Sequence, residues 1–286
     1  MIKIVTDSSA DLSAPIAQEL EISVVPLYVR FGDEVYRERV DITDEEFYQK
    51  LVHGTVHPVT IQPNPKDFAE IYQKLSEKAD AIVSIHLSSK LSGTFNSALQ
   101  AKKMIASKCP IEVLDSQTIT LALGLMTIAV AEAAKAGESL QQVLAVIKEA
   151  MHDIHSLVLL DTLKYLHLGG RIGKAKALLG SILNVKPMIT IRDGEVVPAG
   201  QVRSRAKGIE QLFDFVKNAT NIEDLAVAYS TTLDEAQALS QRLASIFTKG
   251  KIRLTRLGTT LGVHLGPGTL IVTLRGEIPC VRQSKR

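Results

Sequence analysis

The chain has 286 residues, of which 45% are hydrophobic and 22% are charged, so it is long enough for two globular domains and too apolar to be disordered. Its net charge is +2 and its cations are scattered among acids, which argues against a nucleic-acid-binding surface. Cys109 and Cys280 are too far apart for a metal cluster or a disulfide scaffold, and they favour a reducing compartment, the cytoplasm.

Short apolar runs alternate with helical patterns in the first half of the chain. Residues 3–6, 81–86 and 111–114 are predicted strands, and helices are predicted to begin at Ser13, Gly93 and Thr118. This alternation predicts parallel strands joined by crossover helices. The strands at 81–85 and 157–160 are continuously apolar, as expected for strands that are covered on both faces. Ligands of such sheets bind at the carboxyl ends of the strands.

No segment at the N-terminus or in the interior has the length of a signal peptide or a membrane span. The mature protein is therefore expected to begin at Met1. Residues 119–131 form the most apolar stretch, and they predict a buried helix that either packs in the core or lines a cavity.

Two local signals follow in chain order. Thr43 and Glu46 form a capping box and predict a helix start. Pro58, Pro63 and Pro65 then hold the residues between them, 60–62, in an extended conformation.

The pattern changes after residue 160. Residues 171–183 predict a helix, and the Asp193–Gly194 pair predicts a hairpin between strands at 188–191 and 195–197. The predicted fold is therefore α/β with two domains. Residues 1–154 form a mostly parallel sheet flanked by helices, residues 155–286 form a mixed α/β domain with a hairpin, and a ligand binds between them.

The segment 87–94 is a candidate anion site because it joins an apolar strand to a helix. Ser92, Gly93 and Thr94 offer two hydroxyls, free N–H groups at a helix start and a glycine that permits close approach. Ordinary helix capping by serine explains the same residues.

Residues 257–268 are glycine-rich and predict a loop that carries His264. Its imidazole could donate a hydrogen bond to an anion or be merely solvated.

Other motifs are absent. The segment 169–174 resembles a phosphate-binding loop, but Leu168 and Ala175 occupy its required glycine and hydroxyl positions. Ser92 lacks the first glycine of a nucleophile elbow, although Ser92, His264 and Asp7 could still meet as a triad. The histidine spacing predicts no metal site.

Several of these segments together resemble the DegV family of bacterial fatty-acid-binding proteins, over residues 6–274. The matching signatures are Thr6-Asp7-Ser8-Ser9-Ala10-Asp11-Leu12, residues 60–65, residues 91–98, residues 161–187 with their core Gly169-Gly170-Arg171-Ile172, Arg203-Ser204-Arg205, and residues 264–268. Their number and order make the resemblance far more specific than any single one.

The resemblance implies a carrier that holds one long-chain fatty acid between two domains and presents it to a separate fatty acid kinase. It implies that Thr60, Ser92, Gly93, Thr94 and His264 bind the carboxylate. Arg171, Arg203 and Gln62 become candidates for the head-group region or the partner surface, together with Ile61, which replaces the serine that is usual in the family. The chain is then expected to be a monomer without a cofactor or a metal, and not an enzyme.

Two other functions compete with the carrier. A stand-alone acyl hydrolase or phosphotransferase would use Ser92 and His264. A scaffold that binds only proteins would have its interdomain space filled by side chains.

Overall fold

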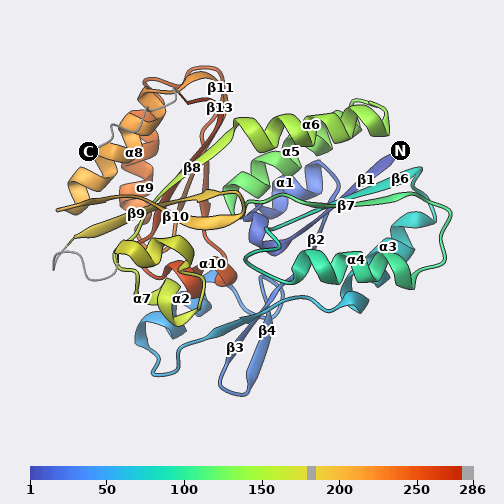
Figure 1. Cartoon of the computed structure of the whole chain (residues 1–286), viewed down its shortest axis with the longest axis horizontal. Helices are drawn as coiled ribbons and strands as arrows, with labels where there is room; N and C mark the ends of the chain where they lie inside the picture. Colours follow the sequence, from blue (N-terminus) through green and yellow to red (C-terminus); the bar gives the residue numbers. More distant parts are fainter. Residues whose placement is uncertain (179–184, 279–286) are drawn as a thin grey trace.

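The computed structural model describes residues 1–178 and 185–278, in an α/β fold with three sheets (Figure 1). Cys280 and residues 179–183 of the predicted helix lie outside this described part. Among the described residues, no helix is both long enough and apolar enough to cross a membrane.

The first sheet is parallel, as predicted, and has the strand order β2-β1-β6-β7. Its strands are β1 (Ile2–Asp7), β2 (Ile22–Val25), β6 (Ala81–His86) and β7 (Ile111–Asp115). The surrounding helices are α1 (Ala14–Glu19), α3 (Pro65–Ser76), α4 (Thr94–Met104), α5 (Leu121–Lys135) and α6 (Leu140–Asp153). Helices α3 and α4 cover one face, and α1, α5 and α6 cover the other (Figure 1). Both faces of β6 are therefore buried, which explains its continuously apolar sequence.

The second sheet contains six strands in the order β10-β9-β8-β13-β11-β12. These are β8 (Ile154–Leu159), β9 (Lys186–Arg192), β10 (Glu195–Val202), β11 (Thr220–Tyr229), β12 (Arg253–Arg256) and β13 (Leu270–Glu277). All of its pairs are antiparallel except β11 with β12, so the sheet is mixed. The predicted hairpin is confirmed as β9–β10, which turns at Asp193 and Gly194, both with positive φ. Helices α8 (Arg205–Lys217) and α9 (Leu233–Leu243) cover one face.

The third sheet is a small antiparallel one of β3 (Tyr28–Phe31), β4 (Glu34–Arg37) and β5 (Val59–Ile61). Helix α2 (Asp44–His53) packs beside it and begins with the predicted capping box of Thr43 and Glu46. All strands of the first and third sheets end before Ile154, and all strands of the second sheet begin at Ile154 or later. The domain boundary at 154/155 remains a prediction.

Helix α5 is buried on both sides because it lies between the two large sheets (Figure 1). Leu121, Leu125 and Ile128 pack toward the second sheet, whereas Leu123 and Met126 pack toward the first. The apolar stretch is therefore mainly core. Ile119 and Thr120, just before the helix, line a cavity between the sheets, and Leu121, Leu125 and Ile128 also line a second, smaller cavity.

Two predicted elements differ from the structure. The segment 257–268 is not a loop, because it contains helix α10 (Thr259–Leu265). In the described part of the segment predicted as a helix, residues 171–178, the structure has the 3-10 turn η2 (Gly173–Leu178), which follows α7 (Lys164–Leu168). Gly173 has a φ of +50°, and its backbone lies against Val196, so a regular helix cannot begin there.

Candidate binding cavity

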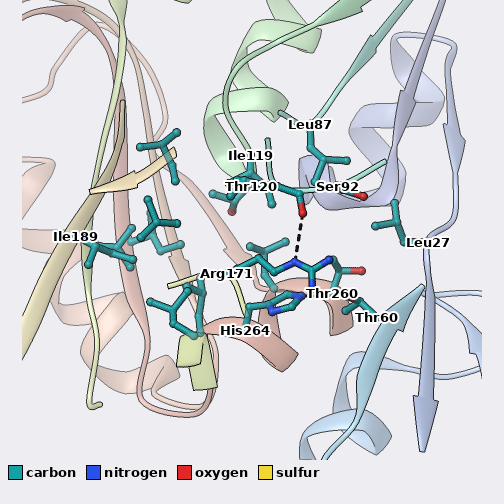
Figure 2. A pocket seen from close by; sticks show the side chains of 18 of the residues that line it. Leu27, Thr60, Leu87, Ser92, Ile119, Thr120, Arg171, Ile189, Thr260 and His264 are labelled. Carbon is teal, nitrogen blue, oxygen red and sulfur yellow. Dashed lines mark hydrogen bonds between the residues drawn. The ribbon is translucent and has the colours of Figure 1, made fainter. Parts of the chain in front are cut away.

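A cavity of about 300 Å³ lies between the sheets, a volume at the lower end of the range for ligand pockets (Figure 2). Most of its lining is aliphatic: Leu27, Ile61, Leu87, Leu91, Ile119, Val158, Leu166, Ile189, Ile191, Val196, Leu261, Leu265 and Ile271. The polar lining residues are Thr60, Gln62, Ser92, Thr120, Ser156, Arg171, Thr260 and His264. Such a lining suits a long apolar ligand with one polar end.

Most of the residues predicted to bind a head group are brought together. Thr60 on β5 and His264 on α10 are in contact, with 3.0 Å between Oγ1 and Nε2. Figure 2 shows Ser92 and Arg171 around the same part of the cavity, with Ile189 on the opposite side. Ser92 Oγ lies 2.9 Å from Thr94 Oγ1. Thr94 is fully buried and is not among the lining residues, so it supports Ser92 from behind.

The cap residue of α4 is Gly93, which has no side chain to accept the first N–H groups of the helix. Ser92 Oγ accepts the N–H of Thr94 instead, at 3.3 Å. A β-carbon at position 93 would overlap the side-chain amide of Gln62. That amide donates to Ser97 Oγ at 3.1 Å, in the first turn of the helix. Gln62 therefore packs across the helix start and joins β5 to α4.

Arg171 is the only cation among the described residues that line the cavity. Its Nε donates to the backbone oxygen of Leu91 at 3.2 Å, and Nη1 donates to that of Gly169 at 2.8 Å. These two bonds hold the guanidinium between the loop before α4 and the segment after α7. The positive charge of this guanidinium could pair with the anionic end of a ligand.

His264 is neutral at physiological pH because burial, the charge of Arg171 and nearby His57 lower its pKa to about 4. Its Nδ1 is buried without a partner among the described residues and lies against Gly169, where a β-carbon would overlap the ring. His264 is therefore a packed helical residue that faces the cavity, and its interpretation as a solvated loop histidine is wrong.

Two buried carboxylates, which the sequence interpretation did not assign to the site, hold the start of α10. Asp11 Oδ1 accepts the N–H of Gly258 at 2.8 Å. Glu38 accepts both the N–H and the hydroxyl of Thr260, each at 2.9 Å. Thr120, another lining residue, donates its hydroxyl to Asp11 Oδ2 at 2.7 Å. We name the pair Asp11 and Glu38 the carboxylate clamp.

Burial raises the pKa of Asp11 to about 7, although the Arg39 guanidinium beside it acts in the opposite direction. The same guanidinium donates to the backbone oxygen of Arg256 at 2.9 Å, just before α10. The clamp therefore connects three parts of the fold: Asp11 follows β1, Glu38 follows β4, and α10 follows β12.

The structure does not assemble the triad that a hydrolase would need. Asp7 contacts His86 rather than His264, with 3.0 Å between Oδ2 and Nδ1. His264 contacts Thr60, and Ser92 contacts Thr94. Among residues 1–178 and 185–278, no group of three or more histidine, cysteine, aspartate or glutamate side chains is arranged to hold a metal ion.

Three other predicted residues differ in whether they line the cavity. Gly93, like Thr94, is not among the residues that line it. Arg203 is exposed and is not among the residues that line the cavity. Ile61 is 37% exposed and lines the cavity, so the alternative that it faces the core is wrong.

Comparison with known proteins finds relatives that match nearly the whole chain. The model of the DegV family, described as an uncharacterised protein family, matches residues 1–276. A DegV domain-containing protein from Deinococcus radiodurans is 34% identical over 277 residues, which cover 96% of this chain and 98% of that one. The protein DegV from Bacillus subtilis is 30% identical over 273 residues, with 94% and 97% covered.

Solved structures agree with this match. A DegV family protein from Thermus thermophilus, described by its fatty acid binding, superposes with a TM-score of 0.89 at 36% identity, over 96% of this chain and 99% of that one. DegV from Bacillus subtilis, described as a fatty acid binding protein, gives a TM-score of 0.89 at 29% identity with the same coverage. A stearic-acid-binding protein from Eubacterium ventriosum gives 0.88 at 28% identity, with 96% and 98% covered.

Replacing Glu38 with alanine should lower the free energy of unfolding by about 3 kcal/mol, because Thr260 and Ser8 lose a buried acceptor. Urea denaturation measures the change. Glu45→Ala is the matched control, since Glu45 is exposed and its ion pair with Arg256 is expected to contribute less than about 1 kcal/mol. Equal losses in the two variants would contradict the clamp.

His264 should reduce the stability of the ligand-free protein as the pH falls from about 6.5, the usual pKa of histidine, to about 4, the pKa of folded His264. In that window the unfolded chain binds a proton that the folded chain does not, which costs on the order of 3 kcal/mol at the acid end. Asp11, whose folded pKa of about 7 lies above its usual value, adds stability over the same window in both proteins. The test is therefore the difference in stability between the protein and His264→Gln, which should shift against the protein as the pH falls. Identical pH profiles of the two proteins would show that His264 is not buried in its neutral form.

Proposed function

The chain belongs to the DegV family, and we propose that it binds one long-chain fatty acid in the cavity and presents the carboxylate to a partner fatty acid kinase. The observation that carries the proposal is the lining itself: aliphatic walls around one cluster of Arg171, Ser92 and Thr60. Family members from Thermus thermophilus and Bacillus subtilis that share this fold are described as fatty acid binding.

The tail would supply most of the affinity. Each buried methylene contributes about 0.8 kcal/mol, so about fifteen contribute roughly 12 kcal/mol before the costs of association are subtracted. The polar cluster then needs only to replace the water that the carboxylate loses and to fix its orientation. The guanidinium of Arg171 provides the charge, and the hydroxyls of Ser92 and Thr60 provide further donors.

His264 would act on the ligand through Thr60. In the neutral imidazole one nitrogen carries the hydrogen and the other accepts. A hydrogen on Nδ1 would be a buried donor without a partner, which is costlier than an unpaired acceptor, so we assign it to Nε2. Nε2 then donates to Thr60 Oγ1, and the hydroxyl hydrogen of Thr60 is free to point at the carboxylate.

This proposal leaves catalysis to the kinase. It assigns the chain no cofactor, metal or nucleic acid, and it treats the protein as a cytoplasmic monomer. Arg203, exposed just before α8, is then available to a partner surface outside the cavity.

The competing function, an acyl hydrolase or phosphotransferase, would need Ser92 activated by His264, but each contacts a different threonine. Turnover of an acyl ester or an acyl phosphate by the chain alone, abolished in Ser92→Ala, would favour this function over the carrier.

Purified protein should contain one fatty acid per chain, detected by mass spectrometry of an organic extract. Lipid-free protein should take up oleate or palmitate. Thr60→Ala combined with Ser92→Ala should weaken retention by about 2 kcal/mol for each charge-assisted bond lost, while the fold persists. Arg203→Gln, outside the cavity, is the control and should retain lipid normally. Absence of lipid together with no uptake would refute the carrier function.

A further inference from the structure

One polar residue of the cavity wall stands apart from the head-group cluster. The hydroxyls of Thr120 and Thr260 are bound to the carboxylate clamp. Apart from Ser156, the other polar lining residues form the head-group cluster: Thr60, Gln62, Ser92, Arg171 and His264. Ser156 belongs to β8, and no hydrogen bond connects it to that cluster among the described residues.

Ser156 pairs with Thr273 on the adjacent strand β13, directly across the antiparallel ladder. The distance between Ser156 Oγ and Thr273 Oγ1 is 2.7 Å, a normal hydrogen bond between hydroxyls. Thr273 is fully buried, so Ser156 is the member of the pair that reaches the cavity. Thr190 also contacts Ser156, but its hydroxyl donates to the backbone oxygen and leaves Oγ free.

A count of hydrogens shows what the pair lacks. Two hydroxyls bring two hydrogens, and their mutual bond uses one. Neither Ser156 Oγ nor Thr273 Oγ1 has another partner among the residues that the structure describes. One O–H is therefore available, together with acceptor lone pairs.

The surroundings of Ser156 are otherwise aliphatic. Val158 lines the cavity two residues further along β8, and Ile271 and Ile189 pair with it from the strands on either side. A plain alkyl chain would pass the Ser156–Thr273 pair and leave its second hydrogen without an acceptor, which is unfavourable for a buried hydroxyl. An oxygen on the chain would accept the available hydrogen.

We propose that Ser156 and Thr273 form a second polar subsite, which selects fatty acids that carry a hydroxyl or keto oxygen along the chain. This inference rests on the proposed function, because it presumes that an acyl chain occupies the cavity. A ligand hydroxyl suits the subsite best, since it can accept the available hydrogen and donate to a lone pair in return.

The test compares stearate with hydroxystearates that differ in the position of the hydroxyl, each titrated into lipid-free protein. At least one position should bind about tenfold more tightly than stearate, the ratio that one hydrogen bond of about 1.4 kcal/mol gives. Ser156→Ala should abolish that preference, so that the variant binds the hydroxystearate and stearate with equal affinity. Thr190→Val is the control, because Thr190 does not line the cavity, and it should keep the preference.

The outcomes separate the two proposals. If stearate binds but no hydroxystearate binds more tightly, or if the preference survives in Ser156→Ala, the subsite is refuted and the carrier function stands. If neither stearate nor any hydroxystearate binds, the carrier function fails and the subsite fails with it. A melting temperature for each variant confirms that the fold is retained.

Discussion

The geometry of the cavity depends on the carboxylate clamp. Burying carboxylates is expensive unless their oxygens are paired, and the oxygens of Asp11 and Glu38 are paired with donors from α10, Thr120 and Ser8. The same bonds fix the first turn of α10, which has only seven residues. His264 lies one turn after Thr260 on this helix, so its position at the cavity follows from the anchored start.

Local signals in the sequence were enough to predict much of the fold. The alternation of strands and helices, the capping box at Thr43 and the Asp193–Gly194 turn each depend on residues close together in the chain. Helix α10 was missed because Gly258, Gly262 and Gly266 predict a loop. The first two of these glycines are explained by contacts instead: a β-carbon at Gly258 would overlap Glu38, and one at Gly262 would overlap Phe47. Such contacts come from residues that are more than 200 positions away.

The site was predicted in part, for a similar reason. Thr60, Ser92, Arg171 and His264 could be named from signatures that resemble a family, and the structure places all four at one cavity. The clamp could not be recognised as part of the site, although Asp11 lies within one of those signatures. Asp11 and Glu38 follow strands of different sheets, β1 and β4, and neither has a sequence spacing to α10 that indicates contact.

Two histidines in this chain show why the cavity is better suited to binding than to catalysis. Each places Nε2 against a hydroxyl: His86 against Ser84 at 2.7 Å, and His264 against Thr60 at 3.0 Å. The Nδ1 of His86 faces the carboxylate of Asp7, which is the arrangement that orients and stabilises an imidazolium in hydrolases. That histidine is fully buried in the first sheet, beyond the reach of a ligand. His264 does face the cavity, but its Nδ1 lies against Gly169 and not against a carboxylate. The charge that acts on this imidazole is the cation of Arg171, which lowers its pKa. An imidazole in these surroundings resists protonation, so it can orient the hydroxyl of Thr60 but is a poor general base.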